Sequence, residues 1–261
     1  MAERLALVRR EPACVIDWGA ALGASAQCLA RAYPRARLIA VDEAAPPASA
    51  PRRKPGAWWP WRRAPRVPPS VAPAALADGA AELLWSNMGL HWEADPEAVM
   101  RRWRRALATD GFLMFSTLGP GTLAGLQEGY RLRGWPAAMA PLVDMHDLGD
   151  MLVQAGFADP VMDQETLTLT WADAEAALAE LRTMGGNAAL QRHPGLRSRR
   201  WRRQLLEVLE GCRQADGRVA LAFEIVHGHA FCPAPRVPVS REATVGVEQL
   251  RSMARAGKAS G

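Results

Sequence analysis

One pattern near the start of the chain constrains its fold most strongly. A short apolar run, Cys14–Trp18, leads into a turn that contains Gly19 and Gly23, and an alanine-rich segment from Ser25 to Ala32 follows. A second apolar run then ends in Asp42. Apolar runs on either side of a turn and a helical segment predict two parallel strands, buried on both faces, with a helix between them. The pattern is therefore a complete βαβ unit.

The alternation of strands and helices continues downstream. Further strands are predicted at residues 82–87, 112–117, 166–171 and 219–225. Helices are predicted after two N-cap residues, Asp95 and Ser198, and across residues 148–155, where Gly156 would end the helix. Strands that alternate with helices are typical of a doubly wound α/β domain with a mostly parallel sheet.

The composition changes twice along the chain. Residues 46–73 are rich in proline, arginine and tryptophan, so we expect a long loop there. Residues 66–71 could form a strand only at the sheet edge, because their two prolines cannot donate ladder hydrogen bonds. Residues 233–261 are first proline-rich and then polar, which predicts a mobile tail. We therefore expect one domain over residues 1–232 that carries the loop as an insert.

Composition also excludes several classes of protein. An apolar fraction of 49% in 261 residues is enough for a sizeable core, which argues against a disordered chain. No stretch approaches the roughly 18 apolar residues of a membrane span, and the start has no signal-peptide pattern, so a cytoplasmic protein is expected. The four cysteines are widely spaced and predict free thiols. His227 and His229 share a strand face but lack a third ligand nearby, so no metal site is predicted.

The net charge of +5 is concentrated in three arginine-rich segments, at residues 52–66, 101–105 and 197–203. Basic faces increase the rate of encounter with nucleic acid, anionic lipid or acidic proteins, without distinguishing between them. The simpler interpretation of any one segment is the solvated face of a helix. Three tryptophans between residues 58 and 61 lie among the first arginines, and such an arrangement would also suit stacking on RNA bases.

Candidate binding residues follow the predicted parallel strands. Ligands of such sheets bind outside the carboxyl ends of the strands, which places residues 17–23, Asp42 and residues 87–92 around one crevice. Gly19 and Gly23 would allow close approach of the backbone, and the Asp42 carboxylate could accept hydrogen bonds from a ribose diol. Taken alone, the same residues could simply form a tight turn and a strand end. An NAD-binding domain uses these elements too, so they do not separate hydride transfer from methyl transfer.

Later segments carry a family resemblance. Residues Leu83–Trp92, Asp110–Leu123 and Asp144–Leu152 resemble the malonyl-acyl-carrier-protein O-methyltransferases of biotin synthesis, and Glu224–Phe231 is similar too. The resemblance runs from about Cys14 to Phe231. It implies the class I methyltransferase fold, which is a Rossmann-like, mostly parallel doubly wound sheet with an antiparallel late strand. It also implies S-adenosyl-L-methionine as the cofactor.

The resemblance also implies roles for individual residues. The implied cofactor-binding residues are Asp17, Gly19, Gly23, Asp42 and Asn87, the last near the methionine end of the cofactor. His91 and Trp92 are candidates for the acceptor pocket, although packing is the simpler role for such an aromatic pair. The implied acceptor is a malonyl thioester of acyl carrier protein or of CoA, and an acidic carrier protein would suit the basic faces.

The implied reaction makes modest chemical demands on the protein. A malonyl carboxylate is already ionised at neutral pH, so its methylation needs no strong general base. Positioning, partial desolvation and neutralisation of the anion could supply most of the rate. The sequence therefore assigns no catalytic residue, and the absence of a triad is no objection.

Three departures from the family pattern lie on the cofactor side. Ala21 stands at the middle glycine of the family's Asp-x-Gly-x-Gly-x-Gly turn, where a positive φ would cost about 1 kcal/mol, and Trp18 replaces an aliphatic residue. Ser70 stands where the family carries an acid that contacts adenine. Only about a dozen residues precede the first strand, where relatives have a leading helical segment. The departures favour one alternative, a non-catalytic paralogue that binds a partner through its arginines, and the tryptophan-rich loop favours another, an RNA methyltransferase.

Overall fold

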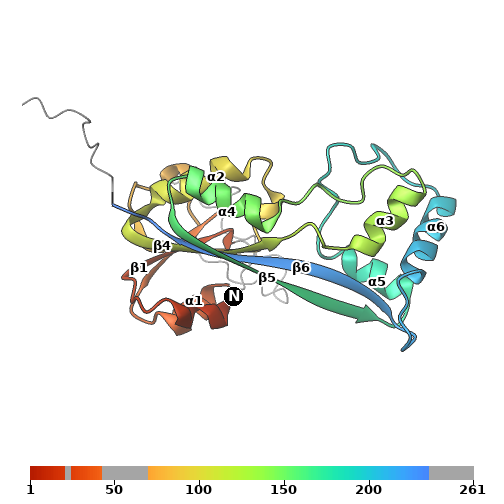
Figure 1. Cartoon of the computed structure of the whole chain (residues 1–261), viewed down its shortest axis with the longest axis horizontal. Helices are drawn as coiled ribbons and strands as arrows, with labels where there is room; N and C mark the ends of the chain where they lie inside the picture. The colour runs from red at the N-terminus through yellow and green to blue at the C-terminus, as the bar shows by residue number, and fades with distance from the viewer. Residues whose placement is uncertain (21–24, 43–69, 235–261) are drawn as a thin grey trace, which may run out of the picture.

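A single sheet organises the chain in the computed structural model, which describes residues 1–20, 25–42 and 70–234. Within these ranges the strand order is β2-β1-β3-β4-β6-β5 (Figure 1). The strands are β1 (Cys14–Trp18), β2 (Arg37–Val41), β3 (Ala81–Asn87), β4 (Leu107–Leu118), β5 (Ala158–Trp171) and β6 (Val219–Phe231). The first four are parallel, and β6 is antiparallel to both β4 and β5. The predicted mostly parallel sheet with an antiparallel late strand is confirmed.

The helices begin and end largely at the residues that the sequence marks. They are α1 (Ser25–Ala32), α2 (Pro96–Ala106), α3 (Ala124–Leu132), α4 (Met145–Gln154), α5 (Ala174–Leu181) and α6 (Arg199–Glu210), with short 3-10 helices η1 (Ala2–Leu7), η3 (Pro73–Ala75) and η4 (Leu90–Trp92). Asp95 and Ser198 cap α2 and α6 by accepting hydrogen bonds from backbone N–H groups of the first turn, as predicted. Gly156, at φ +90°, follows the end of α4.

Two hydrophobic cores lie on the two faces of the parallel strands. One core joins α2 and α4 to side chains such as Ile16, Leu84 and Phe115. The other joins η1 and α1 to alternate residues of the same strands, including Val15 and Phe112. Figure 1 shows α2 and α4 above the sheet and α1 below it. The apolar runs of β1, β3 and β4 are buried on both faces because helices cover both sides.

A third core lies at the far end of the long antiparallel pair β5–β6. There α3, α5 and α6 pack on the two strands through Leu126, Ala177, Leu205 and Phe223, among others, and form a helical cap (Figure 1). Both strands are longer than the sequence predicted, because β5 begins at Ala158 and β6 continues to Phe231. We call α3, α5 and α6, with the loops that join them, the cap.

Other expectations are met in part or lie outside the described residues. Val71, the last residue of the possible edge strand at 66–71, forms a single parallel bridge with Val41, and residues 66–69 of that segment lie outside the described residues. The rest of the expected loop insert, to residue 69, and the expected tail from residue 235 are not among the described residues. All four cysteines are free thiols, as predicted. None of the helices in the described ranges has the length and apolar composition needed to cross a membrane.

Candidate active site

The carboxyl ends of β1 and β2 bring the first predicted site residues to one edge of the sheet. The backbone N–H of Gly19 donates to the carbonyl of Val41 at 2.9 Å, which joins the ends of the two strands. The backbone N–H of Asp42 donates to Val71 at 3.1 Å. Asp17, Gly19 and Asp42 are therefore neighbours along one sheet edge, as predicted. Ala21 and Gly23 lie outside the described residues.

Gly19 has a backbone conformation that favours glycine. Its φ of +83° lies in the left-handed region, and a Cβ atom built there would meet no atom of the described residues within 4 Å. The requirement for glycine is therefore conformational and does not come from crowding. The open space beside its Cα is where a ligand could approach the backbone.

Asp17 is a buried carboxyl group at the start of this turn. It is only 3% exposed, and burial raises its pKa to about 6, while a hydrogen bond with Ser25 opposes the shift. Ser25 is the first residue of α1. The carboxyl group thus links the end of β1 to the start of the helix across the glycine turn, and it can hold the turn in place.

Asn87 ends β3 in a network that controls where the chain goes next. The Ser116 hydroxyl donates to Oδ1 of Asn87 at 2.8 Å. The backbone N–H of Met88, a residue at φ +55°, donates to the Ser116 carbonyl at 2.9 Å. This sharp exit from β3 leads into η4, which carries His91 and Trp92 and packs against β4 through His91 and Thr117.

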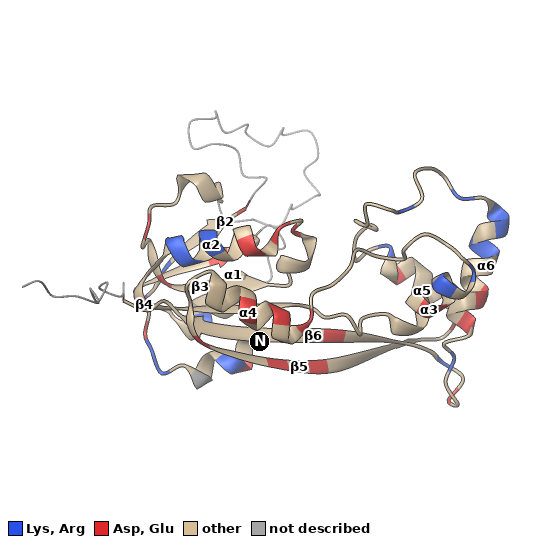
Figure 2. Cartoon of the chain, turned by 45° about the horizontal axis from the view of Figure 1, so that its top comes forward, with Lys and Arg blue, Asp and Glu red and all other residues tan. Residues whose placement is uncertain are grey.

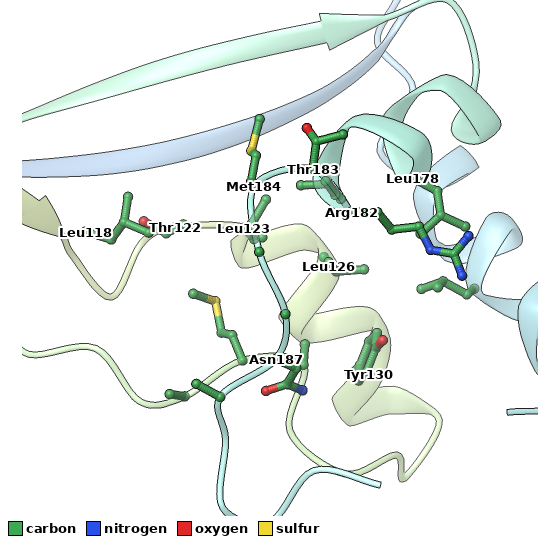
Figure 3. Close-up of a pocket in the computed structure, with 18 of the residues that line it drawn as sticks. Leu118, Thr122, Leu123, Leu126, Tyr130, Leu178, Arg182, Thr183, Met184 and Asn187 are labelled. Carbon is green, nitrogen blue, oxygen red and sulfur yellow. The ribbon is translucent and has the colours of Figure 1, made fainter. Parts of the chain in front are cut away.

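A pocket of about 1030 Å³ lies between this exit and the cap. Apolar side chains from every element of the cap dominate its wall (Figure 3). The wall includes Met88, His91, Trp92, Leu118, Thr122, Leu123, Leu126, Tyr130, Leu178, Arg182, Met184, Asn187, Trp201, Leu205 and Phe223. The structure therefore places both acceptor-pocket candidates, His91 and Trp92, at the pocket, adjacent in sequence to the Asn87 end of the sheet edge.

His91 carries no charge at neutral pH. Its Nδ1 lies 3.5 Å from the Thr117 hydroxyl, and burial lowers its pKa to about 4. Its ring also contacts Trp92, with 5.3 Å between the ring centroids. The side chain therefore offers the pocket a neutral imidazole.

Trp92 is 48% exposed and lies against a glycine of the cap. A Cβ atom at Gly185, which has φ +129°, would lie 2.6 Å from Cη2 of the Trp92 ring. Gly185 belongs to the loop after α5, so the indole joins the end of β3 to the cap across the pocket.

Sequence reasoning missed the pocket residues that come from α3, α5 and α6. For α5 a signal was present, since Ala174, Ala177, Leu178 and Leu181 follow helical spacing after an Asp N-cap. For α3 it was weaker, because Leu123 adopts a left-handed conformation at the helix start and two glycines lie in the helix. The positive groups at the pocket, Arg182, Arg197 and Arg202, were likewise not singled out as ligand contacts.

The turn between β4 and α3 is attached firmly to β6. The Thr122 hydroxyl exchanges hydrogen bonds with the backbone of Glu224, at 3.1 Å in each direction. A Cβ atom at Gly119 or Gly121 would overlap the Glu224 carboxylate. Packing therefore explains the Gly-Pro-Gly-Thr segment that carries part of the resemblance, and it places Leu118 and Leu123 in the pocket wall.

The two histidines of β6 have structural contacts. Nε2 of His227 lies 2.8 Å from Glu165 Oε1 on β5, and burial lowers the pKa of His227. The neutral ring donates from Nε2, while its buried Nδ1 has no partner among the described residues. His229 packs on the Phe231 ring. In the described part of the chain, no three His, Cys, Asp or Glu side chains are grouped closely enough to hold a metal ion.

The structure shows where two of the residues that depart from the family pattern, Trp18 and Ser70, lie. The Trp18 ring packs edge-on against Trp103 of α2, with 6.3 Å between centroids, so its bulk lies in the core and not in the crevice. Ser70 directly precedes Val71, the residue whose carbonyl accepts the Asp42 N–H bond. A hydroxyl therefore stands near the end of β2 where the family pattern has a carboxylate.

Comparisons with known proteins agree with this geometry. The family described as a methyltransferase domain matches residues 16–115. A malonyl-[acyl-carrier protein] O-methyltransferase of Gallionella capsiferriformans is 39% identical over 243 residues, which are 91% of this chain and 83% of that protein. Another, from Laribacter hongkongensis, is 38% identical over 90% of this chain and 81% of that protein. The solved YcgJ protein of Bacillus subtilis shares the fold, with a TM-score of 0.54, 13% identity and coverage of 90% of this chain and all of that one.

Proposed function

We propose, because this chain belongs to the malonyl-[acyl-carrier protein] O-methyltransferase family, that it methylates the free carboxylate of a malonyl thioester on acyl carrier protein. The methyl donor in this proposal is S-adenosylmethionine, and the product would serve biotin synthesis. The observation that carries the proposal is identity of 38–39% over about nine-tenths of the chain. The pocket beside the strand ends supports it, because donor and acceptor must meet there.

The residues at the sheet edge suit the proposed donor. Gly19 leaves open space beside the backbone, and the Asp42 carboxylate follows β2, where it could accept hydrogen bonds from the ribose hydroxyls. Asn87 would lie near the methionine end, and Asp17 would act by holding the glycine turn. Gly23 completes the proposed set. When bound, S-adenosylmethionine supplies an electrophilic methyl group attached to a positively charged sulfur.

The pocket suits an acyl thioester. A volume of about 1030 Å³ is at the upper end of what small-molecule sites usually enclose, and its largely apolar wall would exclude water from the reacting groups. The malonyl carboxylate is ionised at neutral pH and needs no base. The neutral His91 is consistent with that, and positive charge to attract the anion would come from arginines such as Arg182.

Calorimetric titration with S-adenosylmethionine and S-adenosylhomocysteine tests the donor half first. We expect micromolar binding by the wild type and at least about tenfold weaker binding by Asp42→Ala, since a charged hydrogen-bond acceptor is lost. Asp150→Ala, which removes an exposed carboxylate on α4, is the matched control and should bind like the wild type.

Methyl transfer from labelled S-adenosylmethionine to malonyl-carrier protein then tests the acceptor half. A folded protein that binds neither cofactor form would contradict the proposal and favour a non-catalytic paralogue. Equal affinity in Asp42→Ala would contradict the assignment of that residue while leaving the proposed reaction standing.

A further inference from the structure

Two helices carry arginine runs, at opposite ends of the molecule. Figure 2 shows the positive residues of α2 over the parallel part of the sheet and those of α6 at the outer end of the cap. The runs are Arg101, Arg102, Arg104 and Arg105 on α2, and Arg199, Arg200, Arg202 and Arg203 on α6. The two runs are alike in composition, so the contacts of their side chains must show whether they have the same role.

The arginines of α2 are engaged within the protein. Arg101 pairs with Glu97 at 3.1 Å, and Arg105 pairs with Asp78 at 3.2 Å. Arg104 donates to the carbonyls of Gly156 and Pro233 at 3.0 and 3.1 Å. Arg104 and Arg105 thus connect α2 to the segments around it, whereas the Arg101 pair lies within the helix, and all three contacts are structural.

The arginines of α6 are largely unengaged. Arg202 pairs with Glu175 of α5. The side chains of Arg199, Arg200 and Arg203 are exposed and make no hydrogen bond, ion pair or ring contact with any residue that the structure describes. Three neighbouring guanidinium groups without counter-charges among the described residues repel each other slightly, so their presence is not explained by the stability of the helix.

The unengaged arginines are close in sequence to residues that line the pocket. Arg197, stacked 4.6 Å over the Trp201 ring, and Arg202 both line the pocket, and Arg199 lies between them in sequence. Leu196, also in the wall, is fully exposed. An exposed apolar residue bordered by free positive charges resembles the arrangement of protein interfaces, in which a small apolar centre has a charged rim.

We propose that Arg199, Arg200 and Arg203, with Leu196 beside them, form the docking surface for an acidic carrier protein that brings its thioester-linked acceptor to the pocket. This inference rests on the proposed function. Charge complementarity identifies the partner, since an acidic surface would supply the counter-charges that these arginines lack. Rim charges act mainly on association and its salt dependence, so the surface would affect the use of a protein-bound acceptor and leave a small acceptor unaffected.

Two matched variants test the docking surface. Arg199→Glu/Arg203→Glu and Arg101→Glu/Arg105→Glu change the net charge equally and at the same helical spacing. We expect the α6 variant to lower kcat/KM for malonyl-carrier protein about tenfold at low salt, with little change for the malonyl thioester of N-acetylcysteamine. S-adenosylhomocysteine affinity should be unchanged, and the α2 variant should behave like the wild type with both acceptors. A third variant, Arg199→Gln/Arg203→Gln, removes the positive charges without adding carboxylates. Its kcat/KM for malonyl-carrier protein should fall less than that of the Glu variant.

Failure of this inference can be told from failure of the proposed function. If every variant uses the carrier protein equally well, or if the α2 variant loses as much as the α6 variant, the docking surface is wrong and the reaction stands. If the wild type methylates no malonyl thioester, the proposed function fails. Docking can still be measured in that case, by comparing the fluorescence anisotropy of a labelled malonyl-carrier protein with the wild type and with both variants. Salt-sensitive binding of RNA through α6, without binding of carrier protein, would overturn the inference in favour of a nucleic-acid partner.

Discussion

At the ends of β1 and β2 the candidate site is made of backbone hydrogen bonds, a left-handed glycine and a buried carboxyl group, whereas the neighbouring pocket is walled by apolar side chains from the cap. The first region depends on the fully buried strand β1 and on the carboxyl end of its neighbour β2, which is also buried. The second depends on loops, and one of the bonds between them joins Nδ2 of Asn187 to the Ala137 carbonyl at 2.8 Å. A site defined by backbone can tolerate changed side chains around it, which is how Trp18 is accommodated in the core next to the glycine turn. A pocket defined by side chains and loops changes its selectivity whenever they change.

Asp17→Asn should give the largest effect and separates stability from function in the first region. Because the folded pKa of about 6 is raised above the ordinary 3.8, the folded state resists ionisation, and stability is lost as pH rises between these values. The substitution should therefore raise the free energy of unfolding by roughly 3 kcal/mol at pH 7.5, and most of this gain should be gone at pH 4. Urea unfolding at several pH values measures this.

The same variant should bind S-adenosylhomocysteine several-fold more weakly, because the turn loses the charge that holds it. Asp150→Asn, on an exposed carboxyl group, is the control and should change neither property. A stability gain that persists unchanged at pH 4 would show that the ionisation of Asp17 is not its cause.

Gly19→Ala tests whether the open space beside the turn receives a ligand. Strain at φ +83° should lower the free energy of unfolding by about 1 kcal/mol, with no clash against the residues that the structure describes. The new methyl group would occupy the space proposed for the cofactor, so S-adenosylhomocysteine affinity should fall at least about tenfold by calorimetry, beyond what strain explains. Loss of stability with unchanged affinity would place the cofactor elsewhere.

Gly185→Ala makes the corresponding change in the second region. Here the new Cβ would collide with the Trp92 ring, so the indole must move, and the loop can move with it. We expect a shifted tryptophan emission spectrum and a KM for the acceptor raised about threefold. S-adenosylhomocysteine affinity should stay at the wild-type value. An equal effect on both ligands would mean that the two regions are not independent.

The smallest effect concerns pH. Since burial lowers the pKa of His91 to about 4 from 6.5, its imidazole stays neutral from pH 5.5 to pH 8. The acceptor KM should then show no transition near pH 6.5 over this range. Cofactor affinity should instead decline below about pH 6 as Asp17 is protonated, and this decline should be absent in Asp17→Asn. Initial rates measure the acceptor KM, and calorimetric titrations measure the cofactor affinity, over the same pH series.

The parts of the fold that the sequence predicts well are those with a clear local pattern of apolar residues. Strands β1 to β3 and helices α1, α2 and α6 carry strong apolar runs or an amphipathic pattern with a cap residue, and each was located within a residue or two. The first half of β5 was not predicted, because most of its side chains are exposed and show no apolar pattern. The start of β4 was missed because its pairing with β3 is irregular before Phe112, and Asp110 there has a positive φ.

The β5–β6 pair shows why a strand without an apolar pattern depends on its partner strand. Residues of β5 pair with β6 along nearly its whole length, and Gly228 lies where a Cβ atom would overlap the Phe115 ring. Pairing with β6 satisfies the backbone polar groups on the inner side of β5 whatever its side chains are, while the groups on its other side lie at the sheet edge. No local pattern encodes that, since the partner strand follows some fifty residues later.

The sequence by itself determined the βαβ start, the alternation of elements and the positions of Asp17, Gly19 and Asp42 at strand ends, because local periodicity and turn chemistry act over a few residues. Only the tertiary structure decided that His91 and Trp92 share a pocket with α3, α5 and α6. It also decided that Arg101 and Arg105 of α2 form ion pairs, while the side chains of three arginines on α6 have no partner among the described residues. Pocket walls and ion pairs join residues that lie far apart in the chain. Their contacts depend on how whole elements pack, which local sequence does not specify.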